Sequence, residues 1–227
     1  MGPAGAAPVA APAPAPVAAP TARESWTANV LAPVVARAAP AGRATPITVL
    51  RPIAPIGRGG TVLAVRAVRR AAGGRLWVRV LLPIRPNGRE GWVPADVLRF
   101  RRTRLRILID QSERRLTLFR SGRAVLRAPV AIGKPATPTP NGRFAVAELI
   151  RTNQPGAFLG PVVFALTGYS EKLNEFAGGD GRVAVHGTSL PQLIGTRASN
   201  GCIRLRNRDA VRLLRVVRPG VPVTIRP

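Results

Sequence analysis

The chain contains one cysteine and one histidine, Cys202 and His186, which stand 16 positions apart. A thiol becomes a strong nucleophile near neutral pH only when a base removes its proton, because a free cysteine has a pKa of about 8.5. An imidazole is well suited to that task. The pair therefore has the composition of a site for acyl transfer through a thioester, provided that the fold brings the two side chains together.

The residues around the pair favour such an approach. His186 follows the apolar run 183–185, which predicts a strand that ends at the histidine. Cys202 lies in the segment 198–205, whose sequence is ASNGCIRL. The stretch between them contains Pro191 and Gly195, which indicate a turn. A loop of this kind can return Cys202 to the end of the strand that carries His186.

Two further features bear on the thiol. Gly201 lets the backbone approach a bound carbonyl, and the amides around Gly201 and Cys202 are candidates to bind an oxyanion. We also expect positive charge near the thiol to favour its thiolate form, and this charge comes from Arg197, Arg204 and Arg206. The alternative for the pair is structural, with Cys202 as a small buried apolar residue and the histidine as a core residue.

From residue 104 onward, the pattern predicts a mostly β domain with one helix. Strands are expected at 105–110, 115–119, 124–132, 143–150, 162–166, 183–185 and 221–225. The helix is expected over 207–214, with Asn207 as its N-cap and an apolar face formed by Ala210, Leu213, Leu214 and Val217. This helix is expected to pack against the sheet.

The residues before this domain predict a smaller β domain and a linker. Short strands are expected at 47–50, 61–65, 76–80 and 91–93, with glycine-containing turns between them, which favours a small barrel. The segment 89–98, REGWVPADVL, resembles the closing part of bacterial SH3-like domains. Residues 1–20 contain nine alanines and six prolines. We therefore expect a disordered linker over 1–25, an SH3-like domain over 26–102 and a second domain over 103–227.

Composition excludes several classes of site. One cysteine excludes an intrachain disulfide and a multi-cysteine metal site, and one histidine excludes a histidine cage, so neither a metal nor a cofactor is expected. Aromatic residues make up 4% of the chain, which argues against a stacking surface for single-stranded nucleic acid. No apolar run is long enough to cross a bilayer.

Charge is less decisive. The 35 lysines and arginines against 10 acids give a formal net charge of +25. This favours attraction to polyanions, including envelope polymers and nucleic acid. A genome-wide bias toward arginine codons explains the same numbers equally well.

The separated motifs together resemble one family. His-Gly-Thr at 186–188, followed by Ser-Asn-Gly-Cys-Ile-Arg-Leu at 199–205, resembles the catalytic motif of the L,D-transpeptidase (YkuD-type) family. Upstream, 106–119 looks like its opening hairpin, and 133–142, GKPATPTPNG, looks like its Gly-Lys-Pro…Thr-Pro-Thr-Pro-x-Gly turn. The resemblance covers residues 104–227. It implies a mainly β fold, with a small SH3-like barrel followed by a mostly β catalytic domain that has one main C-terminal helix.

The resemblance also implies a reaction. Cys202 corresponds to the nucleophile that attacks the meso-diaminopimelate–D-Ala bond of a peptidoglycan stem peptide. The resulting thioester acyl-enzyme is transferred to an amine, which gives a 3→3 cross-link, or to water. His186 corresponds to the general base, and the backbone carbonyl of Gly187 to its orienting partner.

Other motif positions are expected to shape the pocket. Ser199 and Gly201 match such positions, and Arg204 is a candidate to hold a substrate carboxylate or, equally, to brace the loop through a salt bridge. Asn200 also belongs to the expected pocket, although many family members carry a second histidine there. Tyr169 and the stretch 178–181 are candidates for a lid or for substrate contact, with an ordinary surface loop as the alternative.

The resemblance implies a monomeric enzyme of the cell envelope, outside the cytoplasm, although the chain shows no clear signal peptide. Its expected partners are stem peptides and anionic envelope polymers, and no nucleic acid. An alternative from another class is a non-catalytic module that binds the cell wall or a polyanion. The charge of +25 favours that alternative, and the intact Cys202 and His186 pair opposes it.

Overall fold

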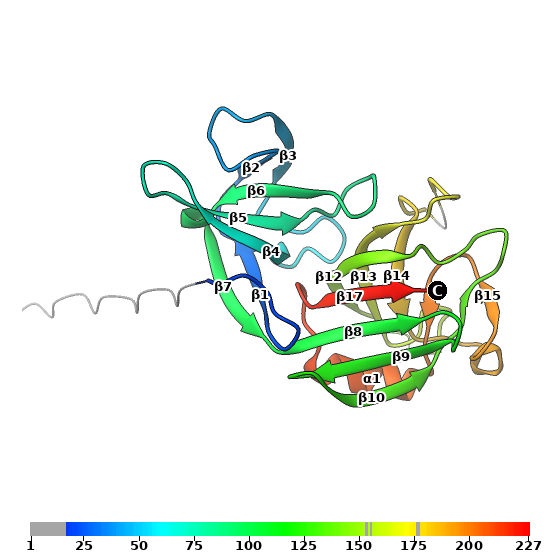
Figure 1. Cartoon of the computed structure of the whole chain (residues 1–227). Helices are drawn as coiled ribbons and strands as arrows, with labels where there is room; N and C mark the ends of the chain where they lie inside the picture. Colours follow the sequence, from blue (N-terminus) through cyan, green and yellow to red (C-terminus); the bar gives the residue numbers. More distant parts are fainter. Residues whose placement is uncertain (1–16, 153, 155, 176–177) are drawn as a thin grey trace, which may run out of the picture.

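The computed structural model describes residues 17–152, 154, 156–175 and 178–227. Most of the predicted linker therefore lies outside the described residues. Within them the chain forms two large β-sheets joined where β7 leads into β8, and one α-helix lies against the second sheet (Figure 1). The predicted mainly β fold with one C-terminal helix is confirmed.

The first sheet contains seven antiparallel strands in the order β3-β2-β6-β5-β4-β1-β7. Their bounds are β1 Ser25–Val30, β2 Val34–Arg37, β3 Pro46–Leu50, β4 Val62–Arg70, β5 Leu76–Leu81, β6 Glu90–Pro94 and β7 Leu98–Thr103. A short 3-10 helix, Ala95–Val97, links β6 to β7. This pairing does not by itself identify an SH3-like barrel, so that assignment stays a prediction.

The second sheet contains eight strands in the order β10-β9-β8-β17-β12-β13-β14-β16. Their bounds are β8 Leu105–Asp110, β9 Arg115–Arg120, β10 Arg123–Pro129, β12 Gly142–Arg151, β13 Val162–Tyr169, β14 Arg182–His186, β16 Ile203–Arg204 and β17 Pro222–Arg226. A two-stranded sheet of β11 Ile132–Gly133 and β15 Arg197–Ser199 lies beside it. The helix α1 spans Asn207–Val216 and contributes Ala210 and Leu213 to the core of this sheet.

The start of α1 differs from the prediction. Arg206, not Asn207, occupies the N-cap position, and it makes no side-chain cap hydrogen bond. The Oδ1 atom of Asn207 instead accepts a hydrogen bond from the amide of Thr188 at 2.7 Å. The expected local cap has therefore become a long-range contact, which ties the helix to the segment after His186.

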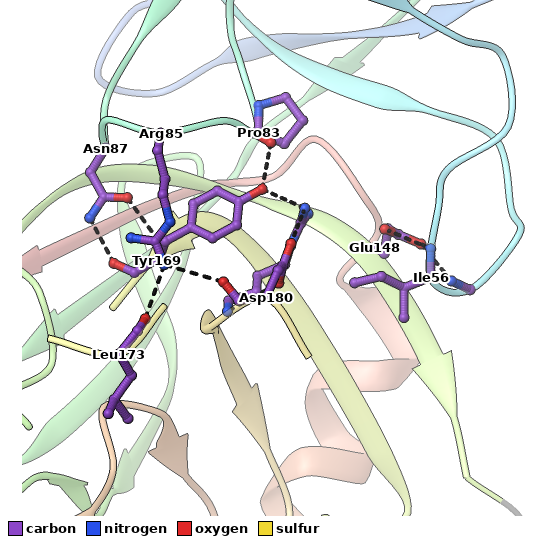
Figure 2. Close-up of polar contacts among 10 residues, drawn as sticks. Ile56, Pro83, Arg85, Asn87, Glu148, Tyr169, Leu173 and Asp180 are labelled. Carbon is purple, nitrogen blue, oxygen red and sulfur yellow. Dashed lines mark hydrogen bonds and ion pairs between the residues drawn. The ribbon is translucent and has the colours of Figure 1, made fainter. Parts of the chain in front are cut away.

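Polar contacts join the two sheets (Figure 2). The Arg85 guanidinium donates to the carbonyls of Ser170, at 2.7 Å, and of Leu173, at 3.0 Å. The Asn87 side chain exchanges two hydrogen bonds of 2.8 Å with the backbone of Tyr169. These bonds hold the loop between β5 and β6 on the end of β13 and on the segment that follows it.

A buried carboxylate makes a second junction. Glu148 on β12 is 5% exposed and accepts hydrogen bonds from the amides of Ile56, at 3.1 Å, and Gly57, at 2.6 Å (Figure 2). Charge-assisted bonds of this kind are stronger than neutral ones. The loop before β4 is thus fixed to the second sheet. Among the described residues, no helix is both long and apolar enough to cross a membrane.

Candidate active site

The register of two parallel strands places the candidate residues on one face. β14 pairs with β16 so that Val185 lies beside Ile203 and His186 beside Arg204. Because side chains alternate along a strand, Cys202, which precedes β16, shares the face of Arg204 and His186, whereas Ile203 enters the core. The amide of Leu205 also donates to the His186 carbonyl at 2.8 Å. The expected return of the cysteine loop to the end of the histidine strand is confirmed.

The imidazole of His186 is held in one orientation. Its side chain is 1% exposed, and Nδ1 lies 2.6 Å from the carbonyl oxygen of Gly187. A carbonyl oxygen only accepts hydrogen bonds, so Nδ1 carries the proton and Nε2 of the neutral ring keeps its lone pair. The orienting contact expected at Gly187 is present.

The electrostatics favour a neutral pair. Burial lowers the pKa of His186 to about 4, the positive charge of Arg204 adds to that lowering, and the backbone of Gly187 and Leu159 partly offsets both. Burial raises the pKa of the Cys202 thiol, although a backbone hydrogen bond with Ala184 and the charge of Arg204 oppose the rise. The resting site therefore holds a thiol beside a neutral imidazole.

The expectation that nearby positive charge favours the thiolate holds for Arg204, which lowers the pKa of Cys202, but burial raises that pKa by more. Of the three arginines in that expectation, Arg204 alone acts on the pKa of Cys202, and the effect of burial is larger. Arg197 is exposed on β15. Cys202 is partly buried, and its desolvation outweighs the effect of the Arg204 cation on its pKa.

Ser199 fixes the backbone around the cysteine. Its side chain is 1% exposed, and Oγ donates to the Cys202 carbonyl at 2.5 Å and accepts from the Gly201 amide at 3.1 Å. Gly201 has φ of 111°, a conformation that favours glycine. Because the Gly201 amide is already engaged, the structure does not support it as an oxyanion donor, and of the two expected amides that of Cys202 remains.

The proline-rich turn 133–142 braces the same loop. Thr139 is 2% exposed; its Oγ1 donates to the Gly201 carbonyl at 2.9 Å and accepts from the Gly133 amide at 2.9 Å. The Lys134 amide donates to the Ser199 carbonyl at 3.0 Å, and the Thr137 hydroxyl lies 3.4 Å from Oδ1 of Asn200. The sequence predicted a turn here but not that the turn supports Cys202. The two closely spaced threonines, Thr137 and Thr139, were the feature that could have indicated this support.

Gly187 and Asn207 set the path of the chain after His186. A Cβ atom at Gly187 would collide with Oδ1 of Asn207 and crowd Cδ of Pro161. The same Oδ1 atom accepts the hydrogen bond from the Thr188 amide. A residue larger than glycine would therefore displace the carbonyl that orients the imidazole.

Phe158 is an aromatic neighbour that the sequence did not single out. It is 44% exposed, its ring centroid lies 6.2 Å from that of His186, and the Arg204 guanidinium lies 4.7 Å over its ring. Arg204 is 6% exposed, and its Nε has no hydrogen-bond partner among the described residues. None of the ion pairs between described residues includes Arg204, so the salt-bridge alternative gains no support from them.

Tyr169 does not lie with these residues. It pairs with Arg182 at the start of β14, whereas His186 at the other end pairs with Val163. Tyr169 is 6% exposed; its hydroxyl donates to the Pro83 carbonyl at 2.7 Å and accepts from Nη2 of Arg182 at 2.6 Å (Figure 2). The expectation that Tyr169 contacts substrate is therefore replaced by a role in joining the two sheets.

The stretch 178–181 lies at the same end of the strands as Tyr169. The Asp180 carbonyl accepts a hydrogen bond from Arg85 at 3.2 Å, which attaches the stretch to the first sheet. It is thus not placed over His186. Within the part of the chain that the structure describes, no group of three or more His, Cys, Asp or Glu residues is arranged to hold a metal ion.

Comparison with known proteins identifies the second half of the chain. The family model for the YkuD L,D-transpeptidase catalytic domain matches residues 104–225. The chain is 34% identical over 122 residues to the L,D-transpeptidase YkuD of Bacillus licheniformis, a match that covers 54% of this chain and 66% of that protein. It is 32% identical over 119 residues to YkuD of Bacillus subtilis, covering 52% and 64%.

The chain therefore spans about two thirds of the length of these relatives. Among solved structures, an Enterococcus faecium L,D-transpeptidase aligns at 22% identity with a TM-score of 0.41, covering 54% of this chain and 49% of that one. Since the family model covers more than half of the chain, including Cys202 and His186, the chain belongs to the YkuD family of L,D-transpeptidase catalytic domains.

Proposed function

We propose that this protein is a cysteine L,D-transpeptidase that acts on peptidoglycan stem peptides. The observation that supports the proposal is the parallel pairing of β14 and β16, in which His186 lies beside Arg204, two residues after Cys202. The contact between Nδ1 of His186 and the Gly187 carbonyl supports it further, because it puts the proton of the neutral ring on Nδ1 and leaves Nε2 unprotonated.

In the first half of the reaction, Sγ of Cys202 attacks the carbonyl carbon of the meso-diaminopimelate–D-Ala bond. The thiol proton passes to Nε2 of His186 as the carbon–sulfur bond forms. The tetrahedral intermediate then collapses, the carbon–nitrogen bond breaks, and His186 returns the proton to the leaving amine. D-Ala departs and a thioester remains on Cys202.

In the second half, the amine of a neighbouring stem peptide attacks the thioester carbonyl. His186 takes a proton from this amine and returns it to the sulfur as the carbon–sulfur bond breaks. The product is a 3→3 cross-link with Cys202 regenerated as a thiol; water in place of the amine gives hydrolysis. This sequence requires no cofactor.

The surrounding residues have different roles in this proposal. The amide of Cys202 is the candidate oxyanion donor, since that of Gly201 is engaged with Ser199. Arg204 carries a buried positive charge beside Cys202 and is the candidate to pair with a substrate carboxylate. Ser199 and Gly187 act as positioning residues, because their contacts hold the backbone at Cys202 and the ring of His186.

The experiment that tests the proposal compares wild type with Cys202→Ala and Cys202→Ser on purified disaccharide–tetrapeptides. Mass spectrometry should detect released D-Ala and cross-linked dimers with wild type only, because the chain has no second thiol. Circular dichroism should show that both variants remain folded. Continued D-Ala release by folded Cys202→Ala would rule out this mechanism.

The alternative remains a non-catalytic module that binds the cell wall or a polyanion, and the net charge of +25 is the observation that favours it. Such a module would sediment with cell walls but release no D-Ala. The two functions therefore separate in the same assay. If peptidoglycan is the substrate, the protein works in the cell envelope, outside the cytoplasm.

A further inference from the structure

A cavity of about 540 Å³ lies where the first sheet meets the end of α1. Residues of β1, β4 and β7 line one side of it, and residues at and after the end of α1 line the other. None of the candidate active-site residues on β14 or β16 lines it. The cavity is thus separate from the Cys202 face, and its properties do not depend on the proposed function.

Strand register places two arginines and two neutral polar residues on the cavity side of the first sheet. β1 pairs with β7 so that Asn29 lies beside Arg99 and Thr27 beside Arg101. All four residues line the cavity. Alternate residues on a strand face the same way about 6.8 Å apart, so Arg99 and Arg101 form a regular cationic row.

Of the arginines on β7 that line the cavity, Arg102 pairs with Glu24 at 3.5 Å, whereas the other two have no balancing acid among the described residues. Arg99 and Arg101 are both exposed, and neither takes part in any ion pair between described residues. On the opposite side, the Arg218 guanidinium donates to the carbonyls of Leu214, at 2.9 Å, and Val217, at 2.8 Å, so its cation is fixed in place. No Asp or Glu is among the described residues that line the cavity.

The neutral residues of the cavity offer further hydrogen-bonding groups. Oδ1 of Asn29 is buried and has no hydrogen-bond partner among the described residues, so this amide is not fully committed to the fold. Thr27 and Thr103 also line the cavity, where the Thr27 hydroxyl donates to the Arg101 carbonyl at 3.3 Å and the Thr103 hydroxyl accepts from the Leu105 amide at 3.2 Å. Like charges on a concave surface create a field that concentrates anions.

We propose that this cavity binds an anionic chain with repeated phosphate groups that is not a nucleic acid. Arginine forks bind phosphate oxygens in pairs, and a row of them favours a ligand whose charges also repeat. None of the described residues that line the cavity is aromatic, so the cavity lacks the aromatic platform on which proteins stack single-stranded bases. A polyol phosphate polymer has this chemistry, and binding to it would leave the Cys202 face free.

The test uses short inorganic polyphosphate as the probe and measures its affinity by isothermal titration calorimetry at near-physiological salt. Arg99→Gln/Arg101→Gln is compared with Arg123→Gln/Arg127→Gln, which removes the same charge from exposed positions on β10. The cavity variant should lose about tenfold or more in affinity, which corresponds to about one lost charge-assisted bond or more, and the control less than about twofold. Circular dichroism checks that both remain folded.

An equal loss of affinity in the two double variants would show that only the net charge attracts the probe, and would overturn the proposal. So would wild-type affinity in the cavity variant. Two further polyanions, matched to polyphosphate in total charge, test whether the cavity selects phosphate groups. Poly-glutamate that binds as tightly as polyphosphate would contradict the assignment to phosphate, and oligothymidylate that binds more tightly would contradict the exclusion of nucleic acid. D-Ala release, measured in parallel, should be unchanged in both variants.

Discussion

The hydroxyl of Thr139 donates a hydrogen bond of 2.9 Å to the carbonyl of Gly201, the residue before the cysteine. The two residues are 62 positions apart in the chain, and both sides of the contact are buried. Since the same hydroxyl accepts from the Gly133 amide, one side chain satisfies two buried backbone groups. The proline-rich turn is therefore part of the support for the nucleophile.

Replacing Thr139 by Val should remove this support while keeping the shape of the side chain. Two buried backbone groups would be left without partners, so the free energy of unfolding should fall by about 1–3 kcal/mol. D-Ala release should also slow, because the carbonyl before Cys202 loses its anchor. Urea unfolding and steady-state kinetics measure the two effects. Thr139→Ser, which keeps the hydroxyl, should restore most of both; equal loss in Val and Ser would point to packing instead.

Gly187→Ala should disturb the site through the orienting carbonyl of His186. The new Cβ would collide with Oδ1 of Asn207, so the backbone after the histidine must shift. We expect kcat to fall by about tenfold or more and the free energy of unfolding to fall by about 1–3 kcal/mol. Gly59→Ala is a suitable control, because a Cβ there meets nothing within 4 Å. Near wild-type kcat in Gly187→Ala would show that a shift of this carbonyl does not impair catalysis.

The parts of the fold with regular patterns were predictable from sequence. Most of the long strands and the helix were expected within a few residues of their observed bounds, because alternation and glycine-rich turns mark them locally. The strand β1 was missed although Ser25–Val30 alternates polar and apolar residues, and the two-residue strand β16 is too short to leave a pattern.

The sequence motifs predicted the central residues of the site but not the residues that support them. Cys202 and His186 are unique in the chain, and the residues between them predicted a loop that returns the cysteine to the end of the histidine strand. The roles of Asn207, Thr139 and Phe158 depend on contacts between distant segments, which no local pattern reports. The raised pKa of the thiol was not predictable for a similar reason, because charge can be counted in a sequence whereas burial cannot.

The pKa of His186 makes stability depend on pH. It is lowered from 6.5 to about 4 in the folded protein, so the unfolded chain binds a proton first as the pH falls. Stability from this residue is therefore fully present above pH 6.5 and is lost as the pH falls toward 4. Between pH 7 and pH 5 the loss should be about 2 kcal/mol, measured by urea unfolding.

His186→Gln provides the control for this pH effect. The variant has no group that titrates at this position, so its free energy of unfolding should change by about 2 kcal/mol less between pH 7 and pH 5. The lowered pKa of Asp110, about 2, affects a more acidic range and is shared by both proteins. Parallel pH dependences in wild type and His186→Gln would contradict a buried, neutral histidine.

Tyr169→Phe separates a role in joining the sheets from one in substrate binding. The change removes the hydrogen bonds of the hydroxyl with the Pro83 carbonyl and with Arg182. The free energy of unfolding should fall by about 1–2 kcal/mol, because two partly buried partners lose a hydrogen bond. KM for the stem peptide should stay unchanged. A clear rise in KM at unchanged stability would return Tyr169 to the substrate site.

A carbapenem should acylate the protein once, at Cys202. The β-lactam carbonyl is an electrophile like that of the scissile amide, and the strain of its ring favours opening. The thiol of Cys202 is neutral at rest, so attack on the ring should need the imidazole of His186 to take the proton. The adduct should then persist, because the opened drug occupies the place of the acceptor.

Intact-protein mass spectrometry of wild type, Cys202→Ser and His186→Ala measures this reaction. One adduct of drug mass is expected on wild type alone, within minutes of mixing. Without the imidazole, the cysteine reacts only through the small fraction of thiolate that its raised pKa allows. Any adduct on His186→Ala should therefore form far more slowly than on wild type, and faster only at alkaline pH. Equally fast acylation of His186→Ala would show that the thiol is activated without the imidazole, and the assignment of His186 as the base would then fail.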